Sequence, residues 1–279
     1  MNVAPITKED VLRISHSFLP APQILLQLGS LLRSPSVSLD DITSRLRMDP
    51  SLTARLIRIA NSAAFASSEP VASVEDAVTL IGFDEVHRLV GFAMLERLGH
   101  GDLPIYGISA KRFMENSLFG ALLMEELSPG AHVDPRACYT VGLLRSIGKV
   151  CLDRLARDWP EEEIPRLTDE LKLSEWERVV FGLTSNEAAA IILTAWRFPP
   201  EFITAINEHY TPDKHNMPLT HLLNLSASMA DILGYGLEGE WRYWLDTEQV
   251  YHKAGLDPKD ANSIIDHAFE SFHRLLKTI

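Results

Sequence analysis

The sequence predicts an all-α fold made of two helical lobes. Apolar residues recur at spacings of three and four along most of the chain, as on the buried face of an amphipathic helix. Several of these segments begin with a helix-capping residue, and no segment alternates polar and apolar residues with a period of two. Two glycines and a proline in Gly99–Pro104 interrupt the pattern, so we place the boundary between the lobes there.

The N-termini of helices are clearest in the first half of the chain. Three segments open with a side-chain acceptor, followed by a carboxylate or a proline where helix starts favour one. These are Ser38 with Asp41, Asp49 with Pro50, and Ser73 with Asp76. Gly82 suits the end of the third helix, and we expect Asp84 to cap the next one.

The second half carries the same apolar spacing. We expect helices over Ser109–Leu127, Pro135–Arg157, Leu173–Leu183, Ser185–Trp196, Pro200–Glu208, Leu219–Leu233 and Asn262–Lys277. Lys172–Arg178, with Glu175 and Glu177, is interpreted as a solvated face. The predicted organisation is an N-terminal arm (1–14), a first helical lobe (15–100), and a second lobe with a C-terminal helical extension (105–279).

Composition limits the classes of function. The chain has 279 residues, 46% of them hydrophobic, and a formal net charge of −12. The acidic balance argues against nucleic acid as a main partner, since such binding needs an excess of Lys and Arg. The N-terminus lacks a signal-peptide pattern, and the longest near-apolar run, Ala188–Trp196, is too short to cross a bilayer. Cys138 and Cys151 are not spaced like metal ligands or a redox pair. We therefore expect a cytoplasmic protein without membrane contact or cofactor.

The most informative segment is VGLLRSIGKV, Val141–Val150. It places Arg145 and Ser146 inside an apolar run. Because a buried charge needs a partner, a helix that buries this run must also supply a counter-charge for Arg145.

Longer motifs carry a family resemblance. In the first lobe they are LPAPQILLQLGSLL (Leu19–Leu32), MDPSLTARLIRIANSAAF (Met48–Phe65) and VASVEDAVTLIGFDEVHRLV (Val71–Val90). In the second lobe they are FMENSLFGA (Phe113–Ala121), VGLLRSIGKVCL (Val141–Leu152), NEAAAIILTAWRFP (Asn186–Pro199), AINEHYTP (Ala205–Pro212) and LSASMADILGYG (Leu225–Gly236). Together, over residues 15–236, they resemble the HDOD family, the HD-related output domain of bacterial signalling proteins. The resemblance implies the two-lobed HDOD fold with an HD-like second lobe.

The resemblance also points to a degenerate active site. Proteins of the related HD phosphohydrolase superfamily hold a metal through histidines and aspartates. The corresponding positions here are Asn116, Arg145, Ser146, Ser185, His209 and Asp231. Only His209 and Asp231 keep a ligand side chain, and a guanidinium has no acceptor with which to bind a cation. The resemblance therefore implies that the metal site is lost.

Two of these positions have alternative interpretations. Arg145 either occupies the old metal position and pairs with Asp231, or is a surface arginine of a slightly shifted helix. His209 is interpreted as a core or loop histidine rather than a ligand, because metal ligands occur as complete sets.

Two further clusters remain open. The arginines of the first lobe either bind an acidic protein face or a nucleotide phosphate, or form a solvated set offset by nearby aspartates. They are Arg33, Arg45, Arg47, Arg55 and Arg58. The WRYW run, Trp241–Trp244, is favoured as packing over an exposed partner anchor.

Taken with the resemblance, the expected function is a non-catalytic bacterial signal-transduction module that acts by contact with other, unidentified signalling proteins. Two alternatives stay open. One is a residual metal-dependent phosphohydrolase or phosphodiesterase. The other is a nucleotide sensor that uses Arg145 as a phosphate clamp in the vestigial cleft.

Overall fold

The structure is a computed structural model of the chain and describes residues 4–18, 21–62, 65, 70–99, 101–168, 170–245, 251, 253–254 and 256–278. Five residues of the segments quoted above lie outside these ranges: Leu19, Pro20, Ala63, Ala64 and His100. The regular structure of the described residues is helical and includes no strand, which confirms the all-α class.

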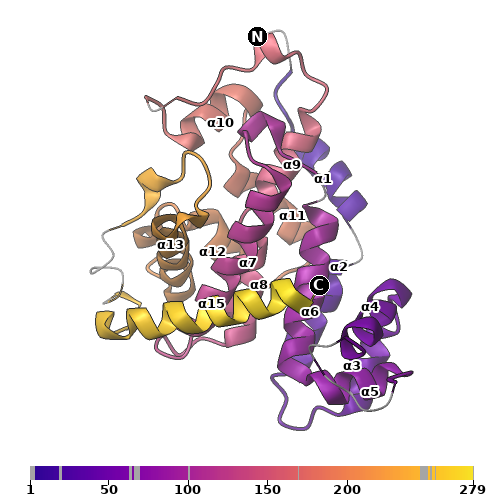
Figure 1. The fold of residues 1–279 in the computed structure, drawn as a ribbon. Coiled ribbons are helices and arrows are strands. Elements are labelled where there is room, and N and C mark those ends of the chain that lie inside the picture. Colours follow the sequence, from indigo (N-terminus) through magenta and orange to yellow (C-terminus); the bar gives the residue numbers. More distant parts are fainter. Residues whose placement is uncertain are drawn as a thin grey trace.

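The first group of helices lies at one end of the molecule (Figure 1). Its members are α2 (Ala21–Leu31), α3 (Leu39–Leu46), α4 (Pro50–Ala60), α5 (Val74–Ile81) and α6 (Phe83–Leu98). Helices α3, α4 and α5 pack against one another, while α2 and α6 also contact α8 of the second group. The first group is thus joined to the rest through α2 and α6.

The predicted N-termini in this group are confirmed. The Ser38 hydroxyl accepts from the backbone of Asp41 in a complete capping box, and Asp49 accepts from Leu52. Gly82 ends α5 with φ +88°, a conformation that glycine adopts without steric penalty. The expected cap at Asp84 is wrong: α6 begins directly after Gly82, so Asp84 lies within its first turn.

The second group surrounds α7. Its members are α7 (Ala110–Leu127), α8 (Pro135–Leu144), α9 (Ile147–Leu155), α10 (Leu173–Phe181), α11 (Ser185–Ala195), α12 (Pro200–Glu208), α13 (Pro218–Ala230) and α15 (Ala261–Thr278). Helix α7 packs against α8, α13 and α15, and α15 runs along one side of the group (Figure 1). Within the predicted arm, residues from Lys8 onward form α1 (Lys8–Ser15), which packs on α9 and α11.

One apolar core runs through both groups. It extends from Leu56 in α4 to Ile192 in α11 and Phe272 in α15. Phe113 and Trp196, two aromatic residues of the family motifs, are buried in it. The predicted boundaries of the lobes stay a prediction, since this core crosses them.

Glu177 corrects the expectation of a solvated face over Lys172–Arg178. Glu175 is exposed, but Glu177 is fully buried because α10 turns it toward α9 and α11. No helix in the described ranges combines the length and the apolar character needed to cross a membrane.

Candidate functional site

The segment that carries Arg145 is bent, not a continuous helix. The helix expected over Pro135–Arg157 is wrong at its centre: α8 ends at Leu144, and α9 starts at Ile147. Ser146, with φ −102° and ψ 14°, lies between them outside helical geometry. Gly148 then passes close to α11, where an added Cβ would lie 1.8 Å from the Ser185 carbonyl oxygen. The bend and this close approach place Arg145 inside the protein.

This close approach predicts that a larger residue at position 148 destabilises the protein. We expect Gly148→Ala to lower the free energy of unfolding by about 3 kcal/mol, because the methyl group overlaps backbone that cannot move aside. Gly120→Ala is the matched control, since a Cβ there meets nothing within 4 Å and alanine favours helix by about 1 kcal/mol. Urea denaturation measures both; equal stability of the two variants would contradict the proposed backbone contact.

Arg145 belongs to a buried network of charges. Its Nη1 donates to Glu240 Oε2 (2.8 Å), and its Nη2 donates to Asn116 Oδ1 (2.6 Å). Lys149, one turn later on α9, donates to the other carboxylate oxygen, Glu240 Oε1 (2.8 Å), and to the Tyr210 hydroxyl (2.9 Å). The Tyr210 hydroxyl in turn donates to Glu240 Oε1 (2.8 Å). Two cationic side chains thus share one carboxylate.

The electrostatics of this network favour an ionised Glu240. Its side chain is fully buried, which by itself raises the pKa, but the charges of Arg145 and Lys149 outweigh burial and lower the pKa to about 2. Burial, followed by the charge of Glu240, raises the pKa of Tyr210 well above its usual value. Tyr210 therefore stays a neutral donor, and the charge of Glu240 is held between the two cations.

His209 closes one side of the network. Its Nδ1 lies 2.7 Å from the Ile206 carbonyl oxygen, which can only accept, so Nδ1 carries the proton. Nε2 is then an acceptor and faces Arg145 Nη1 at 3.5 Å. Burial, followed by the charge of Arg145, lowers the pKa of His209 to about 3. His209 is therefore a neutral core histidine, as the sequence favoured.

A second buried carboxylate lies on the other side of Lys149. Glu177 accepts from the Tyr106 hydroxyl (2.9 Å) and from the Ser185 backbone nitrogen (2.9 Å). Burial raises the pKa of Glu177, and the charge of Lys149 acts in the opposite direction. Ser185 therefore contributes a backbone donor at this position.

Both interpretations of Arg145 are wrong: its side chain is buried, and the carboxylate that pairs with it is Glu240 and not Asp231. Asp231 lies at the end of α13, where a π-helical turn (Asp231–Tyr235) begins, and it accepts from Trp244 Nε1 (3.1 Å). The Arg145 guanidinium lies 5.9 Å from the Trp244 ring centre. Trp244 thus contacts both Asp231 and Arg145.

The WRYW run is mostly packing. Tyr243 is buried and stacks on Tyr210 with 4.0 Å between ring centres, and Trp244 is partly buried. Trp241 differs, because 56% of its surface is exposed. The favoured interpretation is confirmed for Tyr243 and Trp244 and fails for Trp241.

The sequence matches the HDOD domain over residues 19–212. The chain belongs to the HDOD family. Glu240, the carboxylate of the buried network, lies beyond the matched range. Arg145 and Lys149 lie inside it.

Solved structures share the HDOD fold at low sequence identity. An HDOD domain protein from Geobacter sulfurreducens aligns with a TM-score of 0.65 and 18% identity over 96% of this chain and 98% of that one. A candidate phosphohydrolase from Shewanella amazonensis SB2B aligns with a TM-score of 0.67 and 20% identity over 95% and 98% of the two chains. A candidate signal transduction protein from Marinobacter aquaeolei VT8 has a TM-score of 0.65 and 22% identity over 93% of this chain and 58% of its own. A comparison with curated proteins finds no match.

The structure brings some of the predicted site positions of this HDOD protein together and not others. Asn116, Arg145 and His209 are in direct contact. The hydroxyls of Ser146 and Ser185 are buried and have no hydrogen-bond partner among the described residues. Within the same residues, no group of three or more His, Cys, Asp and Glu side chains has a geometry that could hold a metal ion.

Sequence reasoning missed Lys149, Glu240 and Glu177. Lys149 had a signal, because it is a second cation in the same apolar run, one turn after Arg145. Glu240 had none, since it follows a glycine-rich segment whose path only the folded chain defines.

The candidate partner-binding arginines separate into two sets. Arg45 and Arg47 lie on or just after α3, where Arg47 pairs with Glu75 and Arg45 is exposed. Arg55 and Arg58 lie on α4, where Arg55 pairs with Glu96 and Arg58 is exposed. Their role in binding partners stays a prediction.

Proposed function

We propose that this HDOD protein is a non-catalytic signalling module that acts by contact with other proteins. The observation that carries this proposal is the shared ion pair of Glu240 with Arg145 and Lys149 at the ancestral HD position. The family resemblance supports the signalling role, since HDOD domains are output domains of bacterial signalling proteins.

The network supports the loss of catalysis on physical grounds. A divalent cation at this position would face two fixed positive charges, and the carboxylate between them already accepts hydrogen bonds from both. Metal-activated water, the nucleophile of metal-dependent hydrolysis, needs a metal held by several anionic or imidazole ligands. Arg145 and Ser146 replace the His-Asp pair that would supply two of them.

Exposed apolar side chains near the network support a contact surface. Ile232 and Trp241, on the π-helical turn and the segment after it, expose 71% and 56% of their surface. Aromatic residues contribute much of the binding energy of protein interfaces.

Metal content and turnover test the proposal. Protein purified from medium enriched in iron, manganese and zinc is expected to carry far less than one metal per chain and to leave bis(p-nitrophenyl) phosphate intact. Affinity capture from the native host is expected to retain a specific protein, which Trp241→Ala no longer retains. Stoichiometric metal together with turnover would support the alternative, a residual phosphohydrolase.

The position of Arg145 argues against the alternative in which it clamps a nucleotide phosphate. Arg145 is 6% exposed, and its Nη atoms already donate to Glu240 and Asn116. A phosphate would have to displace both partners to reach the guanidinium.

A further inference from the structure

A second feature of the molecule lies where the two groups of helices meet. It is a hollow of about 730 Å³ whose charged lining consists of one glutamate, Glu96, and five arginines. We call it the arginine hollow, and its arginines are Arg55, Arg58, Arg97, Arg154 and Arg157. Helix α4 supplies the first two, α6 supplies Arg97, and the C-terminal end of α9 and the turn after it supply the last two.

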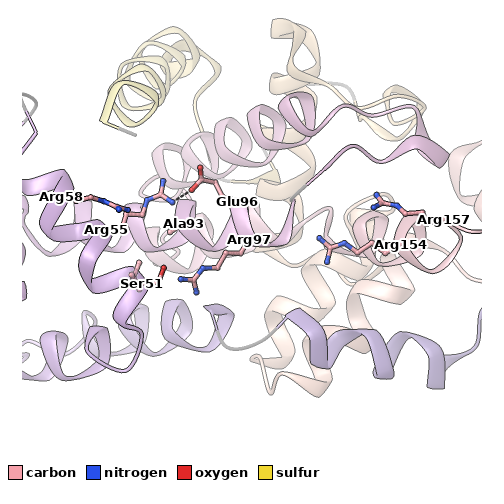
Figure 2. A pocket seen from close by; sticks show the side chains of 9 residues that line it. Ser51, Arg55, Arg58, Ala93, Glu96, Arg97, Arg154 and Arg157 are labelled. Carbon is pink, nitrogen blue, oxygen red and sulfur yellow. Dashed lines mark hydrogen bonds and ion pairs between the residues drawn. The ribbon is translucent and has the colours of Figure 1, made fainter.

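The arginines are spread along the hollow rather than gathered at one point. Figure 2 shows Arg55 and Arg58 at one end, Arg154 and Arg157 at the other, and Arg97 between them. This arrangement suits a ligand whose negative charges are separated.

The charge of the hollow opposes that of the chain. The five arginines outnumber the three carboxylates that pair with them, Glu96, Asp49 and Asp153, although the whole chain has a net charge of −12. Burial, followed by the charge of Arg157, lowers the pKa of Arg154. A bound anion would relieve this repulsion between neighbouring guanidinium groups.

The existing contacts leave donors free. Arg97 pairs with Asp49 (2.6 Å), and Arg55 pairs with Glu96. Arg154 and Arg157 each donate one Nη atom to a backbone carbonyl, at 2.6 and 3.0 Å, and Arg157 also pairs with Asp153 at 3.7 Å. Arg58 makes no hydrogen bond or ion pair with any other described residue. Since each guanidinium has five N–H donors, most of them remain available to a ligand.

We propose that the arginine hollow binds a small molecule carrying two or more phosphate groups, such as a nucleoside polyphosphate or a dinucleotide. Its volume lies within the range of small-molecule sites, and the guanidinium fork matches a phosphate in a bidentate manner. The inference goes beyond the proposed function, because it concerns the arginines that line this hollow and not the buried network. A ligand here would join α4 to α9 and so give the module a chemical input.

Isothermal titration calorimetry on the full chain tests the proposal. The probes are tripolyphosphate, ATP, GTP and a cyclic dinucleotide, with adenosine and matched ionic strength of sulfate as controls. We expect at least one phosphate probe to bind with micromolar affinity. Arg58→Gln and Arg157→Gln should each weaken it roughly tenfold, because each removes one charge-assisted contact. Arg166→Gln, which replaces an exposed arginine outside the hollow, should bind as the wild type does.

Three results would overturn the site. They are the absence of binding by every phosphate probe up to millimolar concentration, an equal loss of affinity in Arg166→Gln, and tighter binding of poly-glutamate, which would indicate an acidic protein partner. Thermal melting of each variant verifies that it folds. The metal and turnover measurements above do not depend on these arginines, so this proposal and the non-catalytic role can fail separately.

Discussion

Replacing Glu240 with glutamine is expected to lower the free energy of unfolding by about 3–5 kcal/mol. Glutamine keeps the shape of the side chain but leaves Arg145 and Lys149 buried without a counter-charge. An unpaired buried charge has lost its hydration without gaining an ion pair, which is why removing one member of a buried pair is so destabilising. Urea denaturation at pH 7 measures the loss.

Two further variants make this result specific. Glu238→Gln removes an exposed carboxylate two residues away and should change the free energy of unfolding by less than about 0.5 kcal/mol. Lys149→Met leaves the Arg145–Glu240 pair intact and should be less destabilising than Glu240→Gln. If Glu238→Gln and Glu240→Gln change the free energy of unfolding equally, the buried network does not stabilise the fold.

Acidification from pH 7.5 to pH 5 is expected to destabilise the protein through two buried histidines. Burial lowers the pKa of His209 to about 3 and that of His87 to about 4, both below the value of about 6.5 for an unfolded chain. As the pH falls below 6.5, the unfolded state gains protons that the folded state does not bind, so stability is lost. Each histidine lowers the free energy of unfolding by about 2 kcal/mol at pH 5.

Two carboxylates, Asp153 and Glu240, also contribute to the pH dependence of stability. Burial raises the pKa of Asp153 to about 6, so its contribution opposes that of the histidines over the same range. Glu240 contributes only below pH 4.5, where its unfolded form takes up a proton and the paired folded form does not.

Variants isolate the histidine contribution. His209→Asn can keep a donor to the Ile206 carbonyl. Between pH 7.5 and pH 5, its free energy of unfolding should fall by about 2 kcal/mol less than that of the wild type. His267→Gln, an exposed histidine of α15, should follow the wild type. An unchanged pH dependence in His209→Asn would show that His209 is not held neutral by the fold.

The helices were largely predictable because their signals are local. The caps at Ser38, Asp49 and Ser73 are formed by residues within three positions of one another, so the sequence displays them directly. The continuous helix expected over Pro135–Arg157 failed for the opposite reason. The bend at Ser146 depends on the approach of Gly148 to α11, which is a contact between segments far apart in the chain.

The candidate site was predictable only in part. The apolar run around Arg145 predicts that this cation needs a counter-charge if it is buried, and the family resemblance predicts that the metal site is lost. One of the two interpretations of Arg145 paired it with Asp231, because that residue matches the last carboxylate of the family pattern. In the structure Asp231 bonds Trp244 instead.

By itself, the sequence determined that the chain is helical, where most of its helices begin, that it resembles the HDOD family, and that Arg145 needs a counter-charge if it is buried. Only the tertiary structure decided that Glu240, 95 residues further along, neutralises it together with Lys149. The path to Glu240 passes through a π-helical turn and Gly239 at φ +78°. The arginine hollow likewise exists only because three helices meet there. Caps and apolar spacing are short-range properties that a sequence displays, whereas the partner of a buried charge is fixed by which distant segments pack together.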